Sequence, residues 1–193
     1  MRNIKEKFEQ LLKKKDADLY ISKFVPATEE QKKKLIELVG KDAYKFIEFY
    51  TNYQPMDFPY LAYARLLDID NLLEENLYNE PAACVAPYGI FAFMKTVGGD
   101  MVCIDVNNMQ DGDPRVVILD HTLVYFDDEL EEKAVLSIPY NIIVKRKENN
   151  EEINDEMSYE NLKQYLPQIE NTFSEFIQKL SENQYNDLEK YMY

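Results

Sequence analysis

The sequence is poor in the residues on which metal centres and nucleophilic active sites most often depend. It has one histidine, His121, and two cysteines, Cys84 and Cys103, among 193 residues. A single histidine excludes the histidine-rich zinc sites, and the spacing of the two cysteines fits no metal-binding motif. Both cysteines lie in apolar surroundings. We therefore expect free buried thiols rather than a disulfide, and a cytoplasmic location.

Long apolar runs and an excess of basic residues are also missing. No segment approaches the roughly 20 apolar residues of a membrane-spanning helix, and the first residues lack the apolar core of a secretory signal. Lysine and arginine number 22 against 36 acidic residues, which gives a net charge of −14. Charge repulsion argues against nucleic acid and anionic membranes as partners, and it permits a basic protein partner.

Glycine is scarce, and four of the five glycines fall within residues 89–121. This stretch holds three short apolar runs, at residues 90–94, 101–104 and 116–119, which turn-forming residues separate. The sequence Gly98-Gly99-Asp100 suits a tight hairpin, because glycine reaches positive φ without a steric penalty. The pattern predicts three consecutive strands of an antiparallel meander, covered on much of both faces.

The N-terminal third of the chain is predicted to be helical. Residues 3–15 place Ile4, Phe8 and Leu11 at helical spacing, and we expect this amphipathic helix to pack on the domain. Thr28 and Gln31 form a capping-box pattern that predicts a helix over residues 29–39, and Gly40 then provides a natural stop.

Further elements are predicted from shorter patterns. Asp42 is the expected cap of a helix that continues to Tyr53. Ser158 is the expected cap of a helical pattern over residues 158–180, and Pro167 should kink this helix or begin a second one. Residues 147–156 are polar and acidic, and we expect an exposed loop. The remaining predictions are strands at 61–66, 82–86, 122–126, 134–138 and 142–144, and a short helix or turn at 69–77.

Candidate catalytic and metal-binding residues are few. His121 follows Asp120 at the end of a predicted strand, but no nucleophile motif accompanies it, and the favoured role is a structural histidine that bonds a neighbouring backbone group. Asp100, Asp105, Asp111 and Asp113 lack the spacing of a calcium loop and are predicted to be turn formers. These residues specify no reaction, no metal and no cofactor, so we expect a protein that is not an enzyme.

An acidic run follows two aromatic residues, Tyr125 and Phe126. Acidic residues steer a basic partner and neighbouring aromatic side chains supply buried contact area, so this segment is the predicted partner-binding surface. A solvated loop without a binding role is the alternative. The residues predicted to bind the partner are Tyr125, Asp127, Asp128, Glu129, Glu131 and Glu132.

Three stretches, taken in order, resemble the SUKH superfamily. Residues 26–50, with P-x-T-E-E followed by L-I-E-L-V-G and D-A-Y-K-F-I-E-F-Y, resemble its two-helix opening. Residues 98–105 (G-G-D-M-V-C-I-D) and 114–121 (P-R-V-V-I-L-D-H) look like its central glycine-aspartate strand and the strand that follows. Residues 171–180 (N-T-F-S-E-F-I-Q-K-L) are similar to its closing helix. They follow one another in the family order between residues 26 and 180.

The resemblance implies an α+β fold. We expect a single domain over residues 1–193, in which N-terminal helices and a C-terminal helix pack on a mixed, mostly antiparallel β-sheet. Residues 1–20 would form an N-terminal helical extension, and residues 127–168 an enlarged connection before the last helix. The chain departs from the family pattern in lacking tryptophan, the Leu-Pro before the second helix and the glycine after it.

The resemblance also implies a function, because bacterial members of the superfamily are chiefly immunity proteins that bind and neutralise toxins. The leading hypothesis is an immunity protein that occludes a basic, nuclease-type toxin domain. A second hypothesis is a non-catalytic interaction module that regulates cell-wall synthesis or signalling, as in fungal relatives. A third is an enzyme centred on His121 with Asp105 or Asp120.

Overall fold

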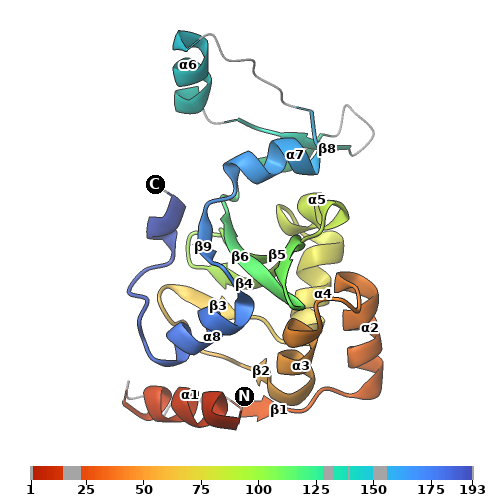
Figure 1. Ribbon diagram of the computed structural model, residues 1–193, viewed down its shortest axis with the longest axis vertical. Coiled ribbons are helices and arrows are strands. Elements are labelled where there is room, and N and C mark those ends of the chain that lie inside the picture. The colour runs from red at the N-terminus through yellow and green to blue at the C-terminus, as the bar shows by residue number, and fades with distance from the viewer. Residues whose placement is uncertain (1, 15–22, 128–132, 139, 150–155, 193) are drawn as a thin grey trace.

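A five-stranded antiparallel sheet forms the centre of the fold (Figure 1). The computed structural model describes residues 2–14, 23–127, 133–138, 140–149 and 156–192. Each pair of neighbouring strands in the sheet is antiparallel, and the α+β class and the central meander are both confirmed. In spatial order the strands are β3 (Ala64–Leu66), β4 (Ile90–Thr96), β5 (Met101–Gln110), β6 (Asp113–Leu119) and β9 (Gln168–Glu170).

The two faces of the sheet belong to two different hydrophobic cores. Successive side chains of a strand point to opposite faces, so Val102 and Ile104 of β5 enter one core while Met101 and Cys103 enter the other. All four are fully buried. The expectation that the central strands are covered on both faces is therefore confirmed.

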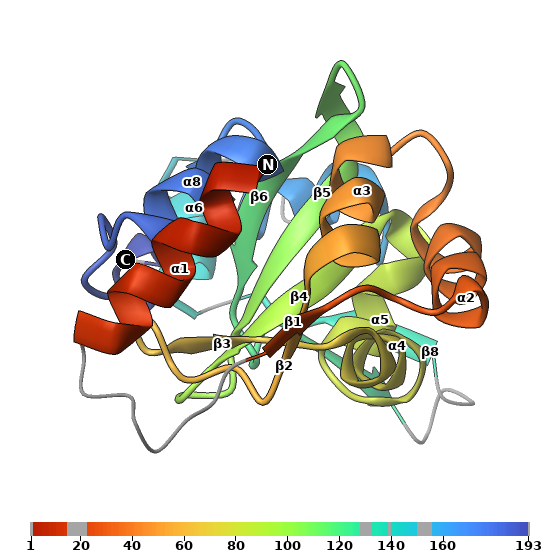
Figure 2. The same cartoon turned by 90° about the horizontal axis from the view of Figure 1, so that it is seen from below.

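Helices cover the first face (Figure 2). These are α1 (Arg2–Lys14), α3 (Tyr44–Tyr53) and α8 (Phe173–Ser181). Phe46 of α3 and Phe93 of β4 both meet Phe173 edge to face, at ring-centroid distances of 4.9 and 5.3 Å. Phe8 of α1 is fully buried against Phe24 and Phe58, so the N-terminal helix packs on the domain as expected.

Shorter elements cover the second face (Figure 1). Leu123, Val124 and Leu136 are buried there, and the last two belong to a hairpin of two paired strands. The elements on this side include α5 (Ala82–Val85), the 3-10 turn η2 (Ala86–Tyr88), β7 (Val124–Asp127), β8 (Lys133–Leu136), α7 (Tyr159–Leu162) and the 3-10 turn η4 (Lys163–Tyr165).

The remaining elements flank these layers. The helices α2 (Glu29–Val39) and α4 (Ile69–Tyr78) lie with α5 along one side of the molecule (Figures 1 and 2). None of the described helices is long and apolar enough to cross a bilayer. The other elements are β1 (Lys23–Val25), which pairs with β2 (Gln54–Met56), α6 (Tyr140–Glu148) and the 3-10 turn η5 (Glu189–Met192).

Helix ends with a complete local signal were predicted well. The capping box is present, because the Thr28 hydroxyl accepts a bond from the Gln31 amide nitrogen and the Gln31 side chain accepts one from Thr28. Gly40 ends α2 with φ of 81°. The prediction for Asp42 was wrong, because Ala43 occupies the capping position of α3 and no side chain caps that end.

Two predicted strands are helical. Residues 82–86 form α5 and the start of η2, and residues 142–144 lie within α6, which also takes in residues 147–148 of the predicted loop. Apolar runs of three to five residues fit a strand or a helix equally well, so the sequence could not decide between them. The predicted strands at 61–66, 122–126 and 134–138 correspond to the shorter β3, β7 and β8, and the predicted 69–77 element is α4.

The predicted helix over residues 158–180 is broken rather than kinked. Pro167 cannot donate a backbone hydrogen bond, but its carbonyl accepts one from the Ile118 amide at the open edge of β6. The chain then continues as β9, and the Thr172 hydroxyl caps α8 by accepting from the Glu175 amide. The helical spacing of apolar residues continues through β9, so the sequence pattern gave no sign of this strand.

Asn76 of α4 joins that helix to β4 at an irregularity in the strand. Its side-chain amide donates to the Ala92 carbonyl and its side-chain oxygen accepts from the Ala92 amide, both at 2.8 Å. The amide also donates to the Leu72 carbonyl, one turn back along α4. Asn76 is buried and bonds Ala92 beyond the end of β3, whose pairing with β4 stops at Met94.

We expect Asn76→Ala to lower the free energy of unfolding by about 2–4 kcal/mol, because both polar groups of Ala92 would be buried without partners. Asn52→Ala is the matched control, since Asn52 also bonds the carbonyl one turn back but is exposed on α3. Urea unfolding measures both variants. Equal losses would contradict the proposed bridging role of Asn76.

Candidate functional site

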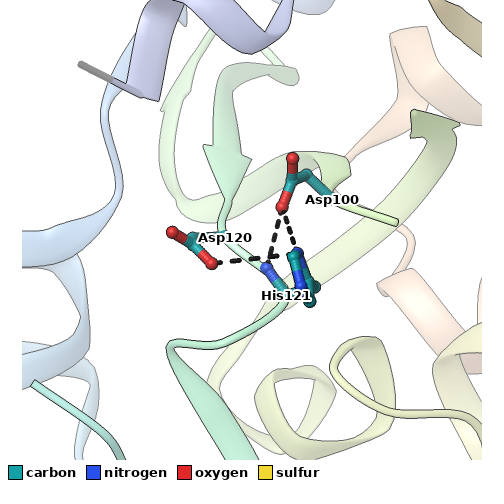
Figure 3. Close-up of side chains that lie close together, drawn as sticks. All are labelled: Asp100, Asp120 and His121. Atoms are coloured by element: carbon teal, nitrogen blue, oxygen red, sulfur yellow. Dashed lines mark hydrogen bonds and ion pairs between the residues drawn. The ribbon is translucent and has the colours of Figure 1, made fainter. Parts of the chain in front are cut away.

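The only histidine is held by a buried carboxylate at the hairpin between β4 and β5 (Figure 3). The Asp100 Oδ1 atom accepts a bond from the His121 backbone amide at 3.0 Å and lies 2.8 Å from His121 Nδ1. Asp100 is buried, whereas the His121 side chain is 51% exposed. The ring therefore bonds a carboxylate rather than the backbone group expected from the sequence.

Asp120 completes a group of three side chains that could hold a metal ion, with ligand atoms within 4.8 Å of one another. Asp120 Oδ1 already accepts bonds from the backbone amide and the hydroxyl of Thr122, and it is 3.9 Å from His121 Nδ1. Asp100 Oδ1 likewise serves two donors. The Asp100 contacts hold the β4–β5 hairpin against the turn after β6, and the Asp120 contacts stabilise that turn itself, so we expect the cluster to have a structural role.

Two catalytic pairings of His121 were considered from the sequence, with Asp105 or with Asp120, and of these only Asp120 lies near the ring, with its Oδ1 atom 3.9 Å from Nδ1. Asp105 does not bond His121 but binds Arg115, and Asp111 and Asp113 lie near Lys45. The histidine partner, Asp100, was missed. The strand register could have revealed it, because Met101 pairs with Leu119 and so places the residues beside them at the same end of the hairpin.

Asp105 forms a second polar centre, on the face of the sheet that the second core covers. It is fully buried and accepts bonds from Arg115 Nε at 3.1 Å, from the Arg115 Nη2 atom and from the Tyr159 hydroxyl at 3.0 Å. The Asn107 backbone amide donates to its other oxygen. Burial and the Asp105 carboxylate raise the pKa of Tyr159, so its hydroxyl stays protonated and donates.

The two cysteines are free and buried, as expected. Burial is the main cause that raises the pKa of Cys84 to about 12, and the nearby Glu80 carboxylate adds to it. Burial also raises the pKa of Cys103. Thiolates are the reactive species, so neither residue has the character of a catalytic nucleophile.

The predicted partner-binding segment is only partly within the described residues. Tyr125 pairs with Val135 in the β7–β8 hairpin and is 41% exposed, and Asp127 pairs with Lys133 at the end of that hairpin. Asp128, Glu129, Glu131 and Glu132 lie outside the described residues.

A surface groove between α2, α4 and η2 was not predicted. It encloses about 990 Å³ and has an apolar floor with acidic residues at its rim. Its residues come from five separate elements (α2, α4, α5, η2 and β4), so no single sequence motif marks it. They are Lys34, Glu37, Leu38, Asp70, Leu73, Glu74, Asn76, Leu77, Tyr78, Ala83, Ala86, Pro87 and Phe91.

Comparisons of the chain with protein-family models, with curated proteins and with solved structures found no match.

We expect Asp100→Asn to lower the free energy of unfolding by about 1–2 kcal/mol, because a neutral amide oxygen accepts more weakly than the carboxylate oxygen that now bonds both His121 nitrogens. Asp120→Asn should change it by less than about 0.5 kcal/mol, since asparagine supports the same side-chain turn. Chemical denaturation of the two variants tests the structural role of the cluster. An Asp100→Asn variant of unchanged stability would contradict it.

Two tyrosines of the same region should differ in how much stability they lose with the hydroxyl. Tyr159→Phe removes a bond to the buried Asp105 and should cost about 1–2 kcal/mol. The Tyr165 hydroxyl is buried without a hydrogen-bond partner among the described residues, so Tyr165→Phe should be neutral or slightly stabilising. Thermal unfolding compares the pair, and a greater loss in Tyr165→Phe would refute this assignment.

Proposed function

We propose that this chain is an immunity protein, which binds a bacterial toxin domain and neutralises it by occluding the toxin's active site. The main support is the ordered resemblance to the SUKH superfamily. The resembling stretches lie on α2 and α3, on the hairpin leading into β5 with the following β6, and on α8. These elements contribute to one hydrophobic core, so the stretches that carry the resemblance are also neighbours in space.

The charge of the chain supports a basic partner. A net charge of −14 attracts a positively charged domain and accelerates its association. A nuclease-type toxin is the natural candidate, because a domain that binds nucleic acid carries a basic surface. The proposal includes a cytoplasmic location, which suits the two free, buried thiols.

The β7–β8 segment is the proposed contact surface. Tyr125 is an exposed aromatic residue, and Asp127 stands at the end of the same strand. Aromatic side chains supply contact area with little loss of conformational entropy, and acidic groups supply steering. The proposed acidic contacts continue along the sequence through Asp128, Glu129, Glu131 and Glu132.

Affinity capture from the source cell at low salt tests this function. We expect one basic partner that carries a toxin-like domain, and co-expression with this chain should restore growth to cells that produce that domain. A captured partner that is not toxic would instead favour regulation of cell-wall synthesis or signalling. A toxin activity that this chain leaves unchanged would refute the proposal.

Charge reversal then tests the proposed contacts. Replacing the acids at 127, 128, 129, 131 and 132 by lysine should slow association at least tenfold. The control reverses five acids elsewhere that are exposed and belong to other elements or loops, so that net charge changes equally. The control residues are Glu6, Glu29, Asp42, Glu48 and Asp57. Equal slowing in both variants would show only a general charge effect and would overturn the assignment.

A further inference from the structure

The groove between α2, α4 and η2 combines an apolar floor with an acidic rim. Phe91 and Ala83 are buried at its base, and Leu38 and Leu73 lie partly exposed along its sides. At one end Leu77 is 51% exposed and the neighbouring Tyr78 is 77% exposed. Single exposed apolar residues are ordinary, but two adjacent large ones beside an apolar groove form a surface suited to burial by a partner.

Acidic groups dominate the rim. Glu37, Asp70 and Glu74 line the groove with a single basic residue, Lys34. Lys34 is engaged by Glu30 at 2.8 Å, and Glu37 has Lys33, outside the lining, at 3.8 Å. The Glu30 carboxylate raises the pKa of Lys34, so the lysine remains charged but locally compensated. The groove therefore has an excess of negative charge.

The ends of two helices add to this negative potential. Neither α2 nor α4 has a basic residue in its last turn, and Glu37 lies in the last turn of α2. The C-terminal end of a helix carries a partial negative charge, which lysine or arginine commonly offsets. Because neither helix has a lysine or an arginine in its last turn, the groove favours a cationic occupant.

We infer that this groove is the docking site for a basic amphipathic helix of the partner protein. The apolar face of such a helix would cover the floor and Leu77, while its lysine or arginine side chains would meet Glu37, Asp70 and Glu74. Two copies of this chain repel each other at −14, and an anionic lipid surface is repelled by the same acids. The inference rests on the proposed function for the identity of the partner as a toxin.

A fluorescently labelled 18-residue peptide of leucine and lysine, patterned as an amphipathic helix, tests the chemistry of the groove without the toxin. Binding should be at least tenfold weaker for Glu37→Gln with Glu74→Gln, and unchanged within twofold for Glu29→Gln with Glu48→Gln. Both pairs are exposed and change net charge equally. Equal weakening of the two pairs would overturn the inference.

A second pair of variants tests the apolar contacts. Leu77→Ser with Tyr78→Ser should weaken peptide binding at least tenfold. Val97→Ser with Tyr140→Ser removes similarly exposed side chains elsewhere and should leave binding unchanged. A chain that self-associates through Leu77 and Tyr78 in sedimentation equilibrium would place a second copy in the groove and would also overturn the inference.

The toxicity of the captured partner and its affinity for the groove variant show whether the groove assignment or the proposed function is wrong. A toxin that binds the Leu77→Ser, Tyr78→Ser chain with full affinity would remove the groove from the interface and leave the immunity function standing. Specific peptide binding together with a nontoxic partner that needs the same residues would support the groove and refute immunity.

Discussion

The buried carboxylate of Asp105 is the interaction on which the second half of the structure depends. A charge without solvent is tolerated only when it is paired and its other lone pairs are bonded, and here Arg115, Tyr159 and Asn107 supply the donors. These donors come from β5, β6 and α7, so one carboxylate fixes the pairing of two central strands and anchors the cover of one face. Apolar contacts alone would let that cover slide, because they are not directional.

The first face of the sheet is held differently. Its core is aromatic, and Phe46, Phe93 and Phe173 meet with edge-to-face geometry that dictates how α3 and α8 approach the strands. The Lys179–Glu170 ion pair ties α8 to β9, and the Lys7–Glu182 ion pair ties α1 to the end of α8. The chain has 22 basic residues against 36 acidic ones. Because such ion pairs engage basic side chains, the excess acidic side chains remain on the exposed surfaces.

Sequence reasoning succeeded where a signal was local and failed where geometry depended on distant residues. The glycines at the hairpin and the capping box at Thr28 act within four residues, so the meander and α2 were predicted. The short runs at 82–86 and 142–144 fit both helical and strand periodicity, and β9 is formed by pairing with β6, which is distant in the sequence. The Asp100–His121 pair and the groove beside Leu77 are formed by chain segments separated in sequence, and neither leaves a contiguous motif.

The packing of α1 against the end of the chain has a consequence for biosynthesis. Phe8 and Leu12 belong to the same core as Phe173 and Leu188, and the Leu188 amide also bonds the Ala62 carbonyl. A ribosome releases the N-terminal segment long before those partners, so the first core stays incomplete until they have been made. Aromatic side chains that meet Phe173, such as Phe46 and Phe93, are not fully covered until α8 emerges. The acidity of the nascent chain then has a second use, because mutual repulsion keeps neighbouring unfinished chains apart during that interval.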